Sequence, residues 1–418
     1  VDTPAATVLV YLQADGQPVD GTAWQQESPY RPVLKRDDGA GTFREIPWSR
    51  LGDGVDDDWR IYARSASDSK GPNIQFLRAL DVMAQAGIVP DYDLKVIIDT
   101  MEEMGSPVLP AAIEQYAQKL SADMLIIFDG PPHYSGRPSL KFGARGIATF
   151  TLTTYGPRVP QHSGHYGNYA PNPGVRLAQI LASMKDERGR VLVEGWYDTT
   201  EPLGAEAAAA LRAMPDWDDE LKRELGLVRT EGEPQTLPER LMVPALNVRG
   251  MTSGNTGSLA RNIIPNTAVA ALGIRLVQGN DPAQLRQLIV DHIERQGFHV
   301  VADDPDVDTR LRYPLIAKVT GGGGSVAART PMSDPFVQQV IAAATEAADR
   351  AFVEGALVLS PGLGGTLPIA LFTDVWRKPA IVVPIANHDN NQHAPDENLR
   401  LANLWYGIDL FAEIMTMP

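Results

Sequence analysis

The 418-residue sequence contains no cysteine. This absence excludes disulfide bonds, thiolate zinc sites and cysteine nucleophiles, so any bound metal must be held by oxygen and imidazole ligands. The chain also lacks an excess of positive charge, because its formal net charge is −15. A nucleic-acid partner requires a basic surface, and we therefore expect none.

Long apolar runs are missing as well. No stretch of the sequence is long enough to span a bilayer as a helix, so no membrane association is expected. No secretory signal segment is recognised at the start of the chain. We expect a soluble protein, and the sequence leaves a cytoplasmic and a periplasmic location open.

Two common hydrolase signatures, His-Glu-x-x-His and Gly-x-Ser-x-Gly, are also absent. His162 and Ser163 are neighbours in the sequence, but adjacency alone does not give the geometry of a nucleophile and its base. Any catalytic site must therefore be recognised from a wider pattern of residues.

Two adjacent carboxylates, Glu102 and Glu103, follow the apolar run of residues 94–98. The run is rich in β-branched residues, which predicts a buried strand. Two carboxylates near its end are costly to bury without a partner, and a metal ion is one such partner. An isolated pair would more often lie in a solvated loop, so the interpretation depends on what gathers at the same place.

Three further strand-like runs, at residues 8–12, 124–128 and 380–385, also lead into polar segments. Ligands of open α/β sheets bind outside the carboxyl ends of the strands, so these segments predict one shared site. Asp68, just before a predicted helix, is a further candidate, although a single aspartate often caps a helix or a turn. The polar residues that follow the three runs are Gln13, Asp15, Asp129, His388 and His393.

The fold class predicted is α/β, with a mostly parallel sheet covered by helices and an inserted smaller α+β domain. Residues 1–144 alternate between strand and helix signals, including a helix from Asn73 to Ala86 that Gly87 should end. Residues 145–318 are predicted to form the inserted domain. Residues 319–418 again show the α/β pattern of residues 1–144. Residues 201–239 are acidic and receive no function, and residues 321–324 read as a flexible turn.

Several short segments occur in an order typical of one family. Together they cover nearly the whole chain, which resembles metallopeptidase clan MH, in the branch of carnosine-type dipeptidases, aminoacylases and succinyl-diaminopimelate desuccinylases. The resemblance implies a dinuclear zinc hydrolase with a ferredoxin-like lid domain. The segments are residues 11–19, 61–72, 101–107, 127–130, 162–164, 172–173, 263–265, 275–277 and 364–368, and His393 with Glu397.

The resemblance implies a set of metal ligands and a general base. Asp68 resembles the carboxylate that bridges two metal ions, and Asp129 resembles a ligand of one ion. Glu103 and His393 resemble the ligands that complete the two sites. Glu102 resembles the general base, which takes a proton from the attacking water. The cofactor expected is Zn²⁺, as one or two ions, with Mn²⁺ or Co²⁺ as alternatives.

Further roles follow from the same resemblance. Asp15 resembles the carboxylate that orients a metal ligand. His162 resembles a lid-domain histidine that stabilises the oxyanion, in some members from the partner subunit. Arg275 resembles a clamp for the substrate carboxylate, and Asn262 and Thr366 occupy other substrate-contact positions. The family also implies a homodimer formed through the lid domain.

The chain departs from the family at two positions. Gln13 stands where most members have a metal-binding histidine, and an amide oxygen is a poorer zinc ligand than imidazole. We therefore predict that one metal site is weakened, and that it is empty or holds a harder ion such as Mn²⁺. His388 is a candidate substitute ligand. Gly362 stands where dipeptidase-like members carry arginine, which leaves the substrate class open.

The function predicted is hydrolysis of an amide bond in a small peptide or an N-acyl amino acid by metal-activated water. The alternative is a non-catalytic or single-metal homologue that binds peptide-like ligands and is weakened by Gln13. The presence of both Glu102 and Glu103 favours the enzyme, because binding alone needs no general base.

Overall fold

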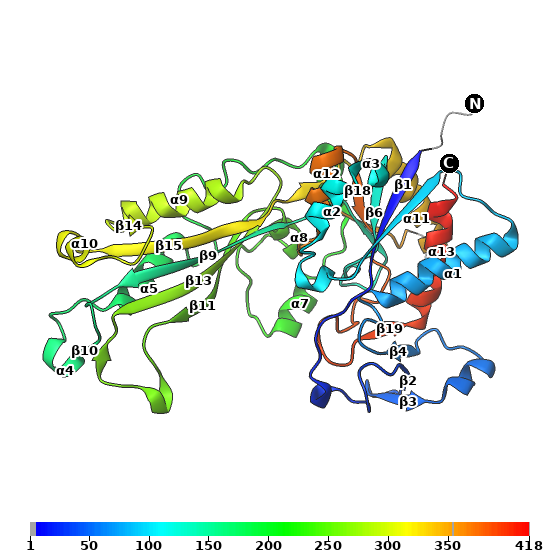
Figure 1. Ribbon diagram of the computed structural model, residues 1–418. Helices are drawn as coiled ribbons and strands as arrows, with labels where there is room; N and C mark the ends of the chain where they lie inside the picture. Colours follow the sequence, from blue (N-terminus) through cyan, green and yellow to red (C-terminus); the bar gives the residue numbers. More distant parts are fainter. Residues whose placement is uncertain (1–5, 353–354, 418) are drawn as a thin grey trace.

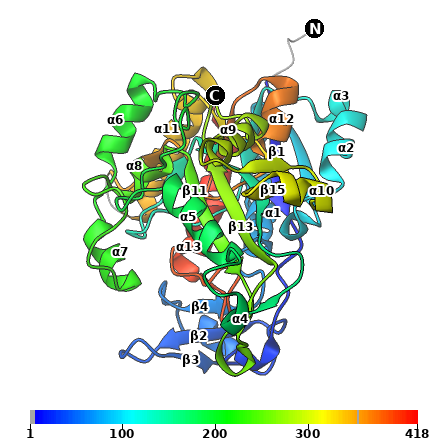
Figure 2. The same cartoon turned by 90° about the vertical axis from the view of Figure 1, so that its left-hand side faces the viewer.

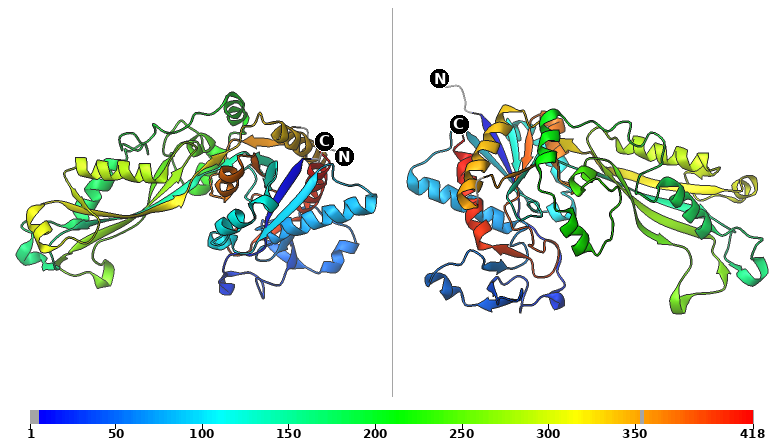
Figure 3. Two further views of the ribbon diagram at one scale, coloured as in Figure 1. Left: turned by 45° about the horizontal axis from the view of Figure 1, so that its top comes forward. Right: turned by 180° about the vertical axis from the view of Figure 1, so that it is seen from behind.

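The computed structural model describes residues 6–352 and 355–417 of the protein. Figure 1 shows a body built around a central sheet, at the right, and an elongated lid domain that extends to the left. The lid points toward the viewer in Figure 2, and the two views of Figure 3 show that it joins the body at one end.

The central sheet has six strands in the order β17-β7-β18-β6-β1-β5. Neighbouring strands run parallel, except that β18 and β7 pair antiparallel. The carboxyl ends of β1, β5, β6 and β18 therefore lie at the same end of the sheet, as the sequence predicts. The strands are β1 (Thr7–Gln13), β5 (Asp93–Asp99), β6 (Met124–Ile127), β7 (Ser139–Lys141), β17 (Val358–Ser360) and β18 (Ala380–Val382).

Helices cover both faces of this sheet. The neighbouring residues Val8 and Leu9 of β1 point into two different cores, as alternation along a strand requires. The first core is closed by α1 (Lys70–Ala86), α11 (Pro335–Ala351) and α13 (Leu401–Met415), and the second by α2 (Leu109–Gln115) and α12 (Ile369–Trp376). Helix α1 ends where predicted, because Gly87 adopts the left-handed conformation. Within the described ranges, no helix combines the length and the apolarity needed to cross a bilayer.

The lid domain contains a five-stranded sheet in the order β11-β13-β9-β15-β14. Helices α5 (Pro173–Met184) and α9 (Pro282–Arg295) bury residues such as Leu177 and Leu285 against it. The chain order β9-α5-β11-β13-α9-β15 is the ferredoxin-like pattern, so the predicted fold class is confirmed. The domain limits predicted at residues 144 and 318 stay predictions. The strands are β9 (Gly146–Tyr155), β11 (Ala245–Thr252), β13 (Thr267–Leu276), β14 (His299–Val301) and β15 (Ile316–Ser325).

A four-stranded sheet, in the order β19-β4-β2-β3, lies on the side of the body shown lowest in Figure 1. Its strands are β2 (Val33–Asp37), β3 (Phe43–Ile46), β4 (Arg60–Tyr62) and β19 (Asn398–Arg400). Strand β4 precedes Asp68 in the chain and β19 follows His393, and the two strands pair with Leu399 opposite Ile61. This sheet therefore brings together two segments that are more than three hundred residues apart.

Two local predictions are wrong. The run at residues 94–98 is expected to be buried, but β5 is an edge strand in which Ile98 is 56% exposed. β-Branched residues favour strands at an edge as well as in the centre of a sheet. Residues 321–324 form no free turn but lie within β15, where pairing with β9 is interrupted between Gly321 and Gly324. Positive φ angles of 86° and 112° at Gly321 and Gly322 allow this bulge.

Candidate metal centre and substrate cavity

Three side chains from distant segments form the centre of the candidate metal site. Asp68 precedes α1, Glu103 lies in the 3-10 helix η3 (Glu102–Met104), and His393 lies between β18 and β19. Nε2 of His393 is 2.8 Å from Oδ2 of Asp68 and 3.2 Å from Oε2 of Glu103. One ligand atom from each residue lies within 4.8 Å of the others. Two carboxylates and an imidazole at this spacing suit a divalent cation such as Zn²⁺.

A second polar pair lies at the ends of β1 and β6. The amide Nε2 of Gln13 donates a hydrogen bond of 3.1 Å to Oδ2 of Asp129, and both side chains are buried. Oε1 of Gln13 is buried and has no hydrogen-bond partner within the described residues. A buried acceptor without a donor is costly, and a cation is a partner that would satisfy it. The residues present therefore fit a cation on this side too, with an amide oxygen in place of an imidazole.

Two residues of the segment after β1 position Glu103. Oδ2 of Asp15 accepts a hydrogen bond of 3.0 Å from the backbone N–H of Glu103. Nε2 of Gln17 donates a hydrogen bond of 2.8 Å to Oε2 of Glu103. Asp15 therefore lies beside the predicted metal ligand Glu103. The sequence assigns no role to Gln17.

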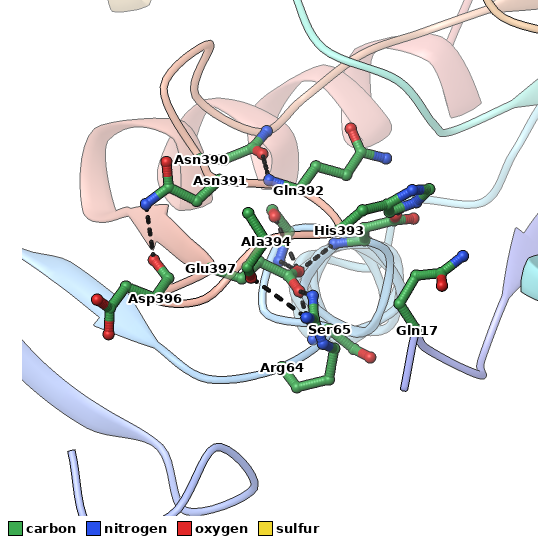
Figure 4. Close-up of polar contacts among 12 residues, drawn as sticks. Gln17, Arg64, Ser65, Asn390, Asn391, Gln392, His393, Ala394, Asp396 and Glu397 are labelled. Atoms are coloured by element: carbon green, nitrogen blue, oxygen red, sulfur yellow. Dashed lines mark hydrogen bonds and ion pairs between the residues drawn. The ribbon is translucent and has the colours of Figure 1, made fainter. Parts of the chain in front are cut away.

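The backbone before Asp68 is held by the carboxylate of Glu397, which is fully buried. Its Oε1 accepts hydrogen bonds from the backbone N–H groups of Asp68 and Ser67, at 2.9 and 3.0 Å. Its Oε2 accepts from Nη1 of Arg64 at 2.6 Å and from the backbone N–H of Ser65 at 3.0 Å. Figure 4 shows Glu397 beside Arg64 and Ser65, on the segment that also carries His393. The sequence does not reveal this role, although Glu397 belongs to one of the segments that resemble the family.

The charges of the site favour a bound cation. Hydrogen bonds to Asp68 and Glu103 raise the pKa of His393 to about 10. Burial raises the pKa of Asp129 to about 7, and the carboxylate of Asp68 adds to this shift. Burial also opposes ionisation of Asp68, but hydrogen bonds from His393 and Gln392 hold the pKa of Asp68 below its usual range. Protonated His393 thus neutralises part of the carboxylate charge, a role that a divalent cation would take over.

Glu102 lines a cavity of about 520 Å³ together with Asp68, Asp129 and His393. Burial raises the pKa of Glu102 to about 8, and the carboxylates of Asp129 and Glu103 add to the shift. A carboxylate whose pKa lies near neutrality is suited to accept and return a proton. The cavity volume suits a small molecule.

The acidic segment, to which the sequence analysis gave no function, contributes a wall of this cavity. It contains α6 (Ala205–Ala213), α7 (Asp218–Leu225) and the start of α8 (Leu237–Leu241). Met214, Leu237 and Leu241 line the cavity. Other apolar residues of the segment, such as Leu225 and Val228, are exposed, so composition alone does not separate the lining residues from the rest.

Two predicted substrate-contact residues meet where the lid joins the body. Nη1 of Arg275, on β13, donates a hydrogen bond of 2.8 Å to Oγ1 of Thr366, which lines the cavity. Gly362 lines the cavity as well. His388 lies beside the ring of Tyr134, with 5.6 Å between the ring centroids, and is not part of the three-residue cluster.

His162 and Asn262 lie elsewhere. His162 belongs to β10 (Gln161–His162), which pairs with β12 (Ile263–Ile264), and the N–H of Ser163 donates to the carbonyl of Asn262 at 2.9 Å. Both residues are exposed. Figure 1 places β10 at the end of the lid that is remote from the central sheet. A single chain therefore brings these two residues together but not to the metal cluster.

Comparison with known proteins identifies the family. The Cys-Gly metallodipeptidase dug1 of Schizosaccharomyces pombe is 26% identical over 362 residues, covering 85% of this chain and 72% of the relative. The Beta-Ala-His dipeptidase of Homo sapiens is 24% identical over 422 residues, covering 98% and 74%. The crystal structure of the M20 family metallo-carboxypeptidase Sso-CP2 from Sulfolobus solfataricus matches with a TM-score of 0.77 and 26% identity, over 100% of this chain and 86% of that one.

A model of peptidase family M20/M25/M40 matches residues 14–417. The function class predicted from the sequence, hydrolysis of an amide bond by a metal-dependent enzyme, is thereby confirmed. The predicted resemblance is confirmed too: the chain belongs to peptidase family M20/M25/M40.

Proposed function

We propose that the protein is a zinc-dependent dipeptidase. The observation that carries this proposal is the cluster of Asp68, Glu103 and His393 beside Glu102, at a cavity of about 520 Å³. Relatives named as Cys-Gly and Beta-Ala-His dipeptidases support a dipeptide as the substrate. An N-acyl amino acid has the same scissile amide and is the competing substrate class.

Asp68, Glu103 and His393 would hold a first ion, and Asp129 with Oε1 of Gln13 would serve a second, weaker position. A bound divalent cation lowers the pKa of water and polarises the scissile carbonyl. Zinc is favoured because imidazole and carboxylate ligands suit it, and Mn²⁺ and Co²⁺ are the alternatives.

The protein's own groups handle the proton and the substrate. Glu102 takes a proton from the attacking water and passes it to the leaving amine. Its position among other carboxylates in a buried site supports this role, because both keep its pKa close to neutrality. Arg275, oriented by Thr366, binds the substrate carboxylate with its forked guanidinium.

A homodimer formed through the lid domain, residues 145–318, completes the proposal. His162 and Asn262 are exposed and remote from the site of their own chain, so a partner subunit could receive them as oxyanion and substrate contacts. The neighbouring edge strand β11 supports such an interface, because its residues Asn247–Thr252 are exposed. Light scattering should give twice the chain mass. A monomer with full activity would refute the role of His162.

The function is tested by paired assays on a dipeptide and its N-acetyl form, with metal content measured by plasma mass spectrometry. We expect bound zinc and cleavage of the free dipeptide. Preference for the N-acetyl form would establish a deacylase instead. Protein that neither binds Zn²⁺ or Mn²⁺ nor cleaves either compound would be a non-catalytic binding protein.

A further inference from the structure

The cavity contains a cationic side chain that the proposed mechanism does not use. Lys141, the last residue of β7, lines the cavity together with Asp129. Within the described part of the chain its ammonium group makes no hydrogen bond, and Asp129 is the charged group that acts on it. Burial lowers the pKa of Lys141 to about 8. Lys141 is half-buried, so its ammonium group faces the cavity without a bonded anion and can pair with an anionic ligand there.

Ser139 supplies a second polar atom at the same place. It lies two residues before Lys141 on β7, so both side chains leave the same face of the strand. Ser139 is 2% exposed and lines the cavity, and its Oγ has no hydrogen-bond partner within the described residues. An unpaired buried hydroxyl beside an unpaired ammonium indicates a site built for a ligand rather than for the fold.

His133 adds a third donor. Its Nδ1 accepts a hydrogen bond of 3.2 Å from the backbone N–H of Ser135, which leaves the proton of the neutral ring on Nε2. Burial lowers the pKa of His133 to about 4, and the charge of Lys141 contributes, so the ring is neutral at pH 7. His133 is 5% exposed and lines the same cavity.

The backbone beside Lys141 keeps this corner open. Lys141 pairs with Ser360 of β17, and Gly362 follows two residues later. Gly362 lines the cavity without a side chain, and a β-carbon there would come within 3.2 Å of Cε of Met242. Glycine at this position therefore adds no side chain to this part of the cavity wall.

We propose that Lys141, Ser139 and His133 form a subsite for a substrate carboxylate, distinct from the Arg275–Thr366 pair. The proposal rests on the peptidase function proposed above and narrows its substrates to peptides with an acidic group. An ammonium, a hydroxyl and an imidazole N–H all donate to carboxylate oxygens, and the ammonium makes the bond charge-assisted. The carboxylate comes either from the side chain of the amino-terminal residue or from that of the carboxyl-terminal residue.

The test uses matched dipeptides that differ in charge at one position: Glu-Ala against Gln-Ala, and Ala-Glu against Ala-Gln. Steady-state kcat/KM is measured on the zinc-loaded enzyme, and affinity is measured by calorimetry in a Glu102→Gln background. We expect Lys141→Met to lower kcat/KM and affinity at least tenfold for one acidic peptide and less than twofold for its amide. Lys141→Arg should retain most of the preference, and Ser139→Ala should lose part of it.

Lys119→Met, at an exposed lysine, is the control and should change nothing. Selectivity for Glu-Ala assigns the carboxylate to the amino-terminal residue, and selectivity for Ala-Glu assigns it to the other. Equal loss for the acidic peptide and its amide, or no loss in a variant that melts like the parent, would overturn the subsite while leaving the peptidase intact. Binding of acidic peptides that depends on Lys141, without turnover by the parent enzyme, would uphold the subsite and refute the proposed function.

Discussion

The two halves of the candidate metal centre differ in how completely their polar atoms form hydrogen bonds within the protein. In the first half, His393 bonds directly to Asp68 and Glu103, and Asp15 and Gln17 bond to Glu103. In the second half, Asp129 faces the neutral amide of Gln13, whose Oε1 has no partner within the described residues. Sites that share one cavity can therefore differ in affinity through a single ligand.

Asp68→Asn should have the largest effect, because Asp68 belongs to the first half and is the proposed link to the second. We expect the bound metal to be lost and dipeptide hydrolysis to fall to background, as measured by plasma mass spectrometry and a peptidase assay. The exposed Asp20→Asn is the matched control and should retain both. An Asp68→Asn enzyme that keeps its zinc would show that this carboxylate is not a ligand.

Glu102→Gln separates chemistry from metal binding. Loss of a general base costs roughly 10²–10⁴-fold in rate, and we expect kcat to fall by that factor. The metal content of both halves should stay at the level of the parent, because Glu102 is not a proposed ligand. Turnover that survives the substitution would remove Glu102 from the mechanism.

Gln13→His should make the two halves more alike. Imidazole is a better zinc ligand than an amide oxygen, so the affinity of the second half should rise about tenfold or more. Zinc titration followed by calorimetry should resolve a weak second ion in the parent and a tighter one in the variant. If both proteins bind the second ion equally, Gln13 does not limit the site.

The pH dependence of zinc affinity should be steepest in the first half of the metal centre. The pKa of His393 is raised to about 10 in the metal-free protein, so metal binding near pH 7 releases one proton. Zinc affinity should rise by about tenfold per pH unit from about pH 7 toward pH 10. Below about pH 7, protonation of Asp129 also competes with metal binding. A competition titration at three pH values checks this. An affinity independent of pH between 7 and 9 would contradict it.

The raised pKa of His393 also affects the stability of the metal-free protein. Zinc affinity rises with pH, whereas this stability falls. Because folding raises the pKa of His393, the stabilisation by its protonated form is complete below about pH 6.5 and is lost as the pH rises through about 10. Metal-free protein should therefore melt at a lower temperature at pH 10 than at pH 6.5, and the difference should shrink in His393→Gln. This is the smallest effect expected, since the His393 side chain is 54% exposed.

The sequence predicts the parts of the site that follow local patterns. Glu102, Glu103 and Asp129 follow strand-like runs, and the parallel sheet places them at one end. Asp68 follows no such run, and its position depends on the long-range pairing of β4 with β19. Its place before a predicted helix makes it a candidate only, and its role as a metal ligand comes from the family resemblance. The sequence does not single out Lys141, because tertiary packing decides whether one lysine lines a cavity.

Long-range packing also explains why His162 lies far from the metal cluster of its own chain. His162 follows a family motif, but its place at the far end of the lid depends on the length of β9 and β13 rather than on its neighbours. The exposure of β5 likewise depends on which strand occupies the edge of the sheet. Neither property is encoded in the residues of the segment alone.

The bond between Glu397 and the backbone of residues 65–68 has a consequence for biosynthesis. The ribosome completes the β1, β5 and β6 segments early, yet the loop that carries Asp68 lacks its anchor until residue 397 has been translated. A chain without residue 397 therefore lacks the carboxylate that holds the backbone before Asp68. Any chain that stops just before residue 397 should therefore be inactive, even though it contains every proposed metal ligand.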